Sequence, residues 1–441
     1  MACLLTLVGP FGTPHSAAAQ APTDSLRIEI SRLAALVDSL SREVARLQAS
    51  GQEEEAGDAL ADLRAAAAAA AAAGSASEPP QETQTFVGRQ RSLQSLNPEI
   101  SLNADVFAHV NQDDTNADNF IPREFEISFQ SALDPFSRAK VFISREVPGG
   151  EVEPFADPSG EEEEGGAGFD VEEGYVEWVS LPGGIGVKFG KFFQRLGTLN
   201  RWHGHALPFQ SRSLPHIAFL GEESLGQTGV SFTWLAPFGG GGSGTYEATI
   251  EIARGENEAL FGGANEATVL GHVNGFWSLG SATDLELGLS WLNGDYRDEV
   301  ESFSRNFYNV EMAFNWIPAA RSRQTGLTIR GGYMLLDGLN AQGAAPGGGD
   351  PTDSAAGFWS MAELRLSSRM LIGARFGRVE NPAAPDVTQW MTSPTVTWWQ
   401  SEFVRIRAEY DFLSGFEGGN DSGMFVLQVT FAMGPHKHTT Y

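Results

Sequence analysis

From residue 97 to the end of the chain, apolar side chains alternate with polar or small ones in segments of about ten residues. In the last of these segments, Phe425, Leu427 and Val429 fall on one face, whereas Gln428 and Thr430 fall on the other. A period of two residues is typical of β-strands. Repeated segments with one apolar face are the pattern of strands that cross a membrane.

The alternation predicts about sixteen strands. They lie near residues 99–110, 122–133, 137–146, 169–181, 184–194, 226–236, 245–255, 267–280, 283–294, 303–317, 323–336, 357–367, 369–379, 386–400, 402–413 and 422–433. The predicted fold is therefore all-β: a transmembrane, antiparallel, up-and-down β-barrel over residues 97–441.

The connections between these segments alternate in length. Short turns are predicted at residues 133–137, 181–183, 279–281, 317–321, 367–368 and 400–401. Longer connections are predicted at residues 111–121, 147–168, 195–225, 256–266, 295–302, 337–356, 380–385 and 414–421. A barrel whose two ends face different compartments has short periplasmic turns and longer extracellular loops. A soluble β-sandwich, the alternative, predicts no such alternation.

The N-terminal region has a helical pattern instead. Apolar residues recur with alternating spacings of four and three at Leu26, Ile30, Leu33, Val37, Leu40, Val44 and Leu47. This repeat predicts a short coiled coil over residues 24–50. A parallel dimer fits its residue types, a trimer stays open, and the alternative is an amphipathic helix packed on its own chain.

Two further segments complete the predicted organisation. An apolar run at residues 4–8, followed by small residues up to Ala19, predicts a signal peptide over residues 1–19 whose true start lies upstream of Met1. The alternative is an ordinary buried segment. Residues 51–96, with an alanine run and Pro79-Pro80, predict a linker. We therefore expect a periplasmic coiled coil and a barrel among the lipids of a bacterial outer membrane.

Composition and motifs narrow the functional classes. A formal net charge of −27 argues against a nucleic-acid partner, because phosphate binding needs a basic face. The one cysteine, Cys3, falls in the predicted signal peptide, so we expect no disulfide. No phosphate-binding loop, nucleophile elbow or HExxH motif occurs in the sequence, so we predict neither an enzyme nor a cofactor.

The alternation also predicts which charged residues line the pore. The later strands place five arginines on the inner face: Arg330, Arg365, Arg375, Arg405 and Arg407. The earlier strands place four glutamates on it: Glu124, Glu126, Glu173 and Glu177. Opposite charges on opposite walls create a transverse field that sorts polar solutes. The alternative is that these residues only pair with one another.

The connection 195–225 differs from the others because it is apolar and broken by prolines. Such a long connection needs something to pack on, so we predict that it folds into the barrel and narrows the pore. Its basic residues are Arg195, Arg201, His203, His205, Arg212 and His216. His203, His205 and His216 are candidate zinc ligands, but no cysteine or carboxylate at a firm spacing completes a site, so packing roles are favoured.

Two resemblances follow from these features. The stretch from Gly190-Lys191-Phe192 through HGHALPF and FLGEESL, about fifty residues with its flanks, resembles proteins labelled zinc-regulated outer-membrane receptors. The layout of signal, coiled coil, linker and about sixteen strands resembles the phosphate-selective porins O and P, which are trimeric anion channels. That resemblance implies passive diffusion of small hydrophilic solutes, with a preference for phosphate-like anions, through a homo-oligomer.

Two other functions remain open from the sequence. The chain could be a metal-linked uptake protein that uses His203, His205 and His216. It could also be a structural barrel that the coiled coil ties to another part of the envelope. Only the channel requires ion conductance.

Overall fold

The computed structural model describes residues 98–112, 119–147, 168–221, 224–237, 244–262, 264–297, 302–339, 354–382, 384–416 and 420–434. The predicted signal peptide, coiled coil and linker lie outside these residues. All the described residues belong to one compact unit, Gln90–Tyr441.

Sixteen β-strands form within the described residues. They are β1 (Glu99–Asn111), β2 (Asn119–Ala132), β3 (Ser137–Glu146), β4 (Asp170–Leu181), β5 (Ile185–Phe193), β6 (Gly226–Leu235), β7 (Thr245–Arg254), β8 (Ala267–Ser278), β9 (Thr283–Arg297), β10 (Ser302–Trp316), β11 (Gly326–Asp337), β12 (Ser354–Arg365), β13 (Met370–Asn381), β14 (Ala384–Trp399), β15 (Val404–Phe416) and β16 (Asn420–Met433). The strand number and positions agree with those predicted from the alternation.

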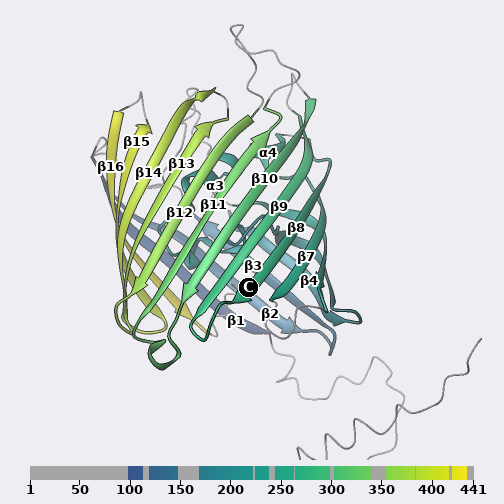
Figure 1. Cartoon of the computed structure of the whole chain (residues 1–441), viewed down its shortest axis with the longest axis horizontal. Helices are drawn as coiled ribbons and strands as arrows, with labels where there is room; N and C mark the ends of the chain where they lie inside the picture. The colour runs from purple at the N-terminus through teal and green to yellow at the C-terminus, as the bar shows by residue number, and fades with distance from the viewer. Residues whose placement is uncertain are drawn as a thin grey trace, which may run out of the picture. The chain divides into compact units, whose positions relative to one another are not determined.

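The sheet closes on itself. Every strand pairs antiparallel with its neighbours in the chain, and β1 pairs with β16, where Asp105 lies opposite Thr430 (Figure 1). Closure leaves no strand edge unpaired, which is what a sheet in a bilayer requires because no water is present there to satisfy backbone groups. The predicted antiparallel barrel is confirmed.

Three of the predicted long connections are wrong. The strands on either side of them extend further and leave only residues 298–301, 382–383 and 417–419 between them. Ser302 still pairs with Arg297, and Phe416 with Asn420. Pairing continues past the apolar positions because the ladder is made by backbone groups and needs no apolar side chain. The connections 147–169 and 194–225 remain long.

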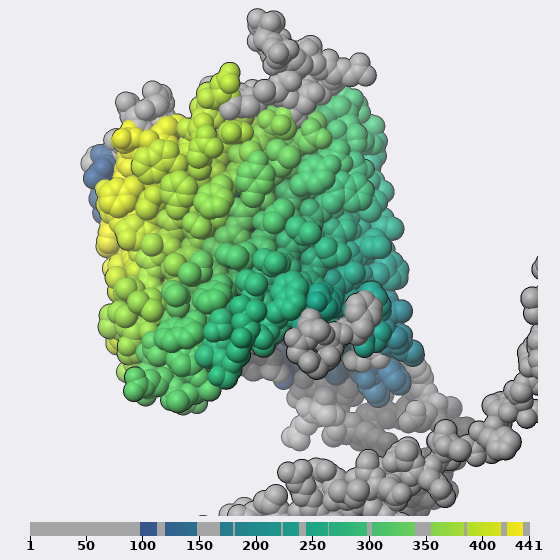
Figure 2. All heavy atoms as spheres, in the orientation of Figure 1, coloured from purple at the N-terminus to yellow at the C-terminus, as the bar shows by residue number. Residues whose placement is uncertain are grey.

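The two faces of the wall differ as the alternation predicts. On β16, Phe425 and Leu427 are 40% and 41% exposed, whereas Val426 and Gln428 are 0% and 1% exposed. The outer face of the other strands is also apolar, and Figure 2 shows part of it. Its exposed side chains include Val269, Val273, Leu287, Leu289, Val310, Met312, Phe358, Ile372, Phe376 and Val396. An apolar surface of this extent is suited to contact with lipid.

The hydrophobic core lies inside the barrel, around the short helices η2 (Leu199–Arg201), η3 (Gly204–Ala206), α3 (Leu214–Leu220) and α4 (Glu258–Phe261) (Figure 1). A fifth, η4 (Ala319–Arg321), follows β10. Leu214 is fully buried in the cluster that also holds Phe307 and Trp359 of the wall. Burying one such side chain contributes about 1.5–3 kcal/mol. No helix among the described residues is long and apolar enough to cross a membrane.

Candidate functional site

Residues 194–225 connect β5 to β6, and the described ones among them, 194–221 and 224–225, run inside the barrel; we call this connection the inward segment. Its two ends are tied together by Asn200. The Asn200 amide Nδ2 donates to the Gln194 and Leu225 carbonyl oxygens at 2.8 and 3.3 Å, and its Oδ1 accepts from the Leu225 N–H at 2.8 Å. The segment therefore leaves and rejoins the wall at one place and forms a closed loop within the lumen.

Three of the arginines predicted to line the pore lie directly against the inward segment. Arg375 donates to the Ser211 carbonyl oxygen at 2.7 Å. Arg405 and Arg407 donate to the carbonyl oxygens of His205 and Leu207 at 2.6 and 2.9 Å. All three arginines are buried. Their guanidinium groups thus bind the segment's peptide groups inside the barrel.

Acidic side chains on β15 balance part of this positive charge. The Arg375 Nη2 lies 2.9 Å from Glu409 Oε1 and 3.3 Å from Asp411 Oδ1. Glu409 also accepts a hydrogen bond from the Gln210 N–H at 2.9 Å, and Asp411 accepts one from the Gln210 side-chain amide at 3.1 Å. The wall therefore binds the inward segment through both its carbonyl and its N–H groups.

Carboxylates on other strands hold the segment near its start. Glu173 on β4 accepts from the Phe193 N–H at 3.0 Å. Glu251 on β7 accepts from the Arg195 N–H at 3.0 Å, and Glu311 on β10 accepts from the Thr198 N–H at 2.9 Å. Buried charges are tolerated where such hydrogen bonds satisfy them. Arginines of β13 and β15 thus meet segment carbonyls, carboxylates of β7 and β10 meet segment N–H groups, and the β4 carboxylate meets the N–H of the wall residue just before the segment.

Two β-bulges shape the wall near the start of the segment. On β2 the register shifts between the pairs Asp105–Glu124 and Phe107–Ile121, and Arg123 and Glu124 are both buried although they are adjacent. On β4 the register shifts beside Glu173, and Glu172 and Glu173 both contact His203. A bulge adds one residue to a strand and redirects side chains that strict alternation would separate.

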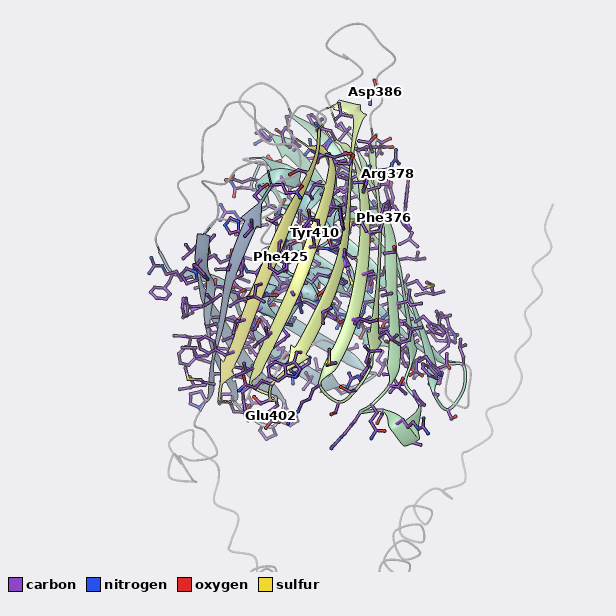
Figure 3. The ribbon with its side chains drawn as sticks, turned by 90° about the vertical axis from the view of Figure 1, so that its left-hand side faces the viewer. Phe376, Arg378, Asp386, Glu402, Tyr410 and Phe425 are labelled. Carbon is purple, nitrogen blue, oxygen red and sulfur yellow. The ribbon has the colours of Figure 1, made fainter. Side chains whose placement is uncertain are left out.

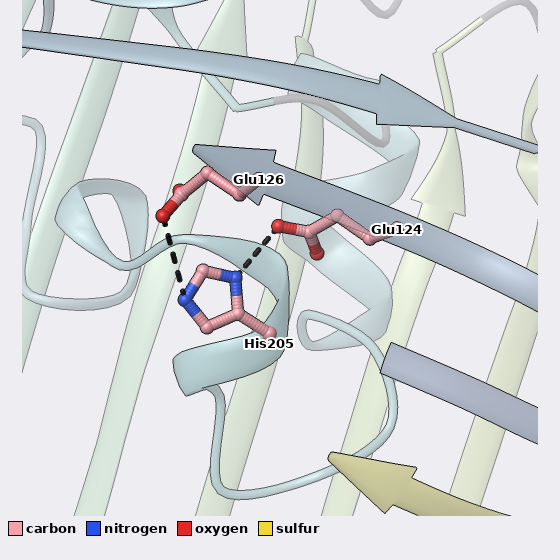
Figure 4. Close-up of side chains that lie close together, drawn as sticks. All are labelled: Glu124, Glu126 and His205. Atoms are coloured by element: carbon pink, nitrogen blue, oxygen red, sulfur yellow. Dashed lines mark hydrogen bonds and ion pairs between the residues drawn. The ribbon is translucent and has the colours of Figure 1, made fainter. Parts of the chain in front are cut away.

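His203 and His205 of the inward segment face these bulged strands. His203 Nδ1 lies 2.6 Å from Glu172 Oε2 and 2.8 Å from Glu126 Oε2, and its Nε2 lies 3.2 Å from Glu173 Oε2. His205 Nδ1 lies 2.6 Å from Glu124 Oε1, and its Nε2 lies 3.9 Å from Glu126 Oε1 (Figure 4). Two imidazoles and four carboxylates therefore form one buried cluster, which we call the His–Glu cluster.

The electrostatics of the His–Glu cluster favour protonated imidazoles. Burial lowers the pKa of His203, but the carboxylates of Glu126 and Glu172 outweigh burial and hold that pKa well above its usual range. Burial likewise lowers the pKa of His205, and Glu124 and Glu126 reverse the effect and raise it. Each imidazolium then pairs with the carboxylates that face it.

His216, the third candidate zinc ligand, lies elsewhere. It is on α3, its Nδ1 is 2.6 Å from Ser213 Oγ, and its ring stands edge-on to Trp359 with the centroids 5.4 Å apart. Burial, with Arg212 nearby, lowers the pKa of His216 to about 3. The predicted ligands His203 and His205 are therefore brought together without His216.

A cavity of about 840 Å³ lies at the short-turn end of the barrel, between the ends of β11 to β14. Figure 3 shows the two ends of the barrel, with Glu402 at the short-turn end and Asp386 at the other. The charged residues that line the cavity are Arg323, Arg330, Arg365, Arg369, Glu363 and Glu402. Arg330 lies 3.4 Å from Glu363 and 5.0 Å from the ring centroid of Trp202 in the inward segment. Positive charge is in excess in this cavity.

Three of the four remaining predicted residues, Arg195, Glu177 and Arg212, have contacts nearby. Arg195 forms an ion pair with Glu247 on β7, and Glu177 forms one with Arg138 on β3. The buried Arg212 donates to the Trp202 carbonyl oxygen at 2.6 Å. Arg201 lies in η2 and is partly buried. These residues shape the segment and the wall beside it.

Several charged residues of the inner wall were not predicted from the sequence, among them Asp105, Arg123, Glu172, Glu251 and Glu311. Alternation could have found Asp105, Glu251 and Glu311, whose buried positions follow a period of two on their strands. Nothing in the sequence signals the bulges that turn Arg123 and Glu172 inward. Arg123 forms an ion pair with Asp105 and donates to the Gln210 carbonyl oxygen.

No protein-family model matches the sequence, and no curated protein matches it. Among solved structures, OprB of Pseudomonas putida is similar with a TM-score of 0.56 and 12% identity, over 81% of this chain and 99% of that protein. The anion-selective porin of Comamonas acidovorans is similar with a TM-score of 0.51 and 11% identity, over 76% of this chain and 100% of that protein. At such low identity the likeness concerns the fold: this chain has the barrel fold of these porins.

Proposed function

We propose that this chain is a bacterial outer-membrane channel through which small hydrophilic solutes diffuse passively. The observation that carries the proposal is a closed barrel with an apolar outer face, a charged inner face and a segment held across its lumen by hydrogen bonds. In this account the inward segment narrows the path, and Arg375, Arg405 and Arg407 act mainly by holding that segment in place. Solutes pass the charged groups that the segment leaves accessible.

We further propose a preference for anions, of the phosphate type. Arg323, Arg330, Arg365 and Arg369 support it, because four guanidinium groups against two carboxylates concentrate anions in the cavity at the short-turn end. The resemblance of the sequence layout to phosphate-selective porins and the barrel shared with an anion-selective porin support the same direction.

The assembly is a separate proposal. The predicted coiled coil at residues 24–50 would join copies of the chain in the periplasm as a trimer or a dimer. Crosslinking of the intact protein, followed by counting of the linked chains, distinguishes these two states from a monomer.

Ion conductance distinguishes the channel from two alternative functions. A structural barrel that tethers the envelope would conduct no ions. A metal-linked uptake protein is favoured by the His–Glu cluster, in which His203 and His205 face four carboxylates. Because His216 lies against Trp359, outside the cluster, a metal site in that alternative would use glutamates as ligands in place of His216.

Planar-bilayer recordings test the proposal. The purified full-length protein should produce discrete conductance steps, and a salt gradient should give a reversal potential of the sign expected for anions. Absence of conductance in protein shown to be folded would remove the channel. A reversal potential of the opposite sign would remove only the anion preference.

A further inference from the structure

His203 Nδ1 faces two carboxylate oxygens at nearly the same distance, Glu172 Oε2 at 2.6 Å and Glu126 Oε2 at 2.8 Å. A ring nitrogen carries at most one hydrogen, so it can satisfy only one of these oxygens well. Glu126 is 0% exposed, and its Oε2 has no donor besides the His203 Nδ1 that it shares with Glu172. The site therefore contains a buried carboxylate oxygen that is directed at an imidazole and lacks a donor of its own.

These groups converge as metal ligands do. Glu126, Glu172 and His203 each offer one ligand atom, and the three atoms lie within 4.8 Å of one another. Around a tetrahedral zinc ion with bonds of about 2.0–2.1 Å, neighbouring ligand atoms lie about 3.3 Å apart. The separations of 2.6 and 2.8 Å are those of groups that share a proton, and they need to widen by about 0.5–0.7 Å to admit an ion.

We propose that the His–Glu cluster binds one divalent transition-metal ion of the zinc type, held by His203 Nδ1 and by the carboxylates of Glu126 and Glu172. The ion takes the place of the hydrogen on Nδ1 and satisfies both carboxylate oxygens at once. His205 keeps its 2.6 Å contact with Glu124 and supports the neighbouring wall.

The donor set determines which ions fit. One imidazole with two carboxylates suits zinc and similar transition metals, and leaves one position of a tetrahedral site open. Calcium takes six to eight oxygen ligands and magnesium retains an octahedral shell of oxygens, so the imidazole makes this site unsuitable for both. The four carboxylates around the two imidazoles also leave an excess of negative charge that a divalent ion would offset.

Such an ion would fasten the inward segment to the wall. His203 belongs to the segment, whereas Glu126 and Glu172 belong to β2 and β4. Binding would therefore join three parts of the chain by coordination bonds and stabilise the inward position. Only this effect on the channel rests on the proposed function; the binding itself does not.

Zinc titration of the intact full-length protein tests the inference. The protein is purified without a histidine tag, stripped with a chelator and followed by isothermal calorimetry in detergent. The variants and their parent carry His436→Ala and His438→Ala, so that tail histidines do not contribute. We expect one Zn²⁺ ion per chain and no comparable Ca²⁺ binding. His203→Gln, Glu126→Gln and Glu172→Gln should each weaken Zn²⁺ binding by on the order of 100-fold or more.

His216→Gln is the matched control, because His216 is a buried histidine of the same segment outside the cluster. It should bind Zn²⁺ as the parent does. The mobility of unheated samples in gels shows whether each barrel is folded. Should Glu126→Gln fail to fold, Glu172→Gln carries the test, since the Glu172 side chain is 13% exposed and tolerates change better.

Three results would overturn the inference: no saturable Zn²⁺ binding by the folded parent, unchanged affinity in folded Glu172→Gln, or equal weakening in His216→Gln. Conductance is recorded separately on the metal-free protein. Zinc binding without conductance would remove the channel and leave the metal site, and conductance without zinc binding would do the reverse.

Discussion

Arg375 on β13 and Glu409 on β15 form an ion pair inside the barrel, with Nη2 2.9 Å from Oε1 and both side chains 1% exposed. Both residues also bind the inward segment: Arg375 donates to the Ser211 and Arg212 carbonyl oxygens, and Glu409 accepts from the Gln210 N–H. The pair thus joins two strands of the wall to the inward segment in the lumen. Its charges stabilise the position of the segment while they satisfy each other.

Removing one partner of this pair should be costly. Arg375→Met leaves Glu409 and Asp411 buried without their counterion, so we expect the free energy of unfolding to fall by about 3–5 kcal/mol. Urea titration of the folded barrel, followed by tryptophan fluorescence, measures this change. The double variant Arg375→Met, Glu409→Gln should lose less than the two single variants added together. Additive losses would show that the two residues do not act as a pair.

Arg378→Met is the control for that experiment, because Arg378 lies three residues along the same strand with its side chain 54% exposed. Its loss should change the free energy of unfolding by less than about 0.5 kcal/mol. A loss in Arg378→Met as large as that in Arg375→Met would mean that any arginine of β13 has this effect.

Two glycines of the wall allow α3 to pack closely. A Cβ atom on Gly357 would lie 2.6 Å from Pro215 Cβ, and one on Gly377 would lie 2.9 Å from Leu214 Cβ. Gly357→Val should therefore push α3 away from β12 and further into the lumen, and so lower single-channel conductance. Gly271→Val is the control, since a Cβ atom on Gly271 meets its nearest neighbour, Trp291, only at 3.9 Å. Unchanged conductance in folded Gly357→Val would show that α3 does not limit the path.

His216 should make the protein sensitive to acid. Burial lowers its pKa to about 3, whereas the unfolded chain has the ordinary value of about 6.5. Between these values the unfolded state binds more protons than the folded state, so stability is lost as the pH falls from about 6.5 to about 3. The free energy of unfolding of His216→Gln should fall less over this interval than that of the parent. Parallel pH profiles would contradict this origin of the acid sensitivity.

The arginines of the short-turn cavity should set the charge preference. Arg365→Glu reverses one charge in that cavity, so the reversal potential in a salt gradient should shift toward cations. Arg378→Glu makes the same change at an exposed position toward the other end of the barrel (Figure 3), and should shift the potential much less. Equal shifts in both variants would indicate a general charge effect and no role for the cavity.

The strands were predictable because their signal is local. On β16 the outward residue Phe425 and the inward residue Gln428 follow from a period of two alone. The bulges on β2 and β4 were not predictable, because an extra residue such as Glu172 leaves no mark on the hydrophobic pattern. The extension of the last strands beyond their apolar positions was not predictable either, because backbone pairing leaves no mark on side-chain polarity.

The candidate site was predictable only in outline. Alternation gives the inward direction of Arg375, Arg405 and Arg407, but the groups that they bind in the inward segment are mainly carbonyl oxygens, which every residue carries and no sequence pattern singles out. The separation of His216 from His203 and His205 follows from α3, whose packing on β12 and β13 is set by contacts distant in the sequence. Side-chain type and alternation give the direction of a side chain, and the tertiary fold determines what it meets.

We propose that the inward segment limits passive conduction through an open barrel. The decisive experiment is single-channel recording of the parent beside a variant in which residues 198–220 are replaced by a short Gly-Ser linker. We expect small conductance steps for the parent and steps several-fold larger for the variant. Equal steps, or no steps in either folded protein, would contradict it.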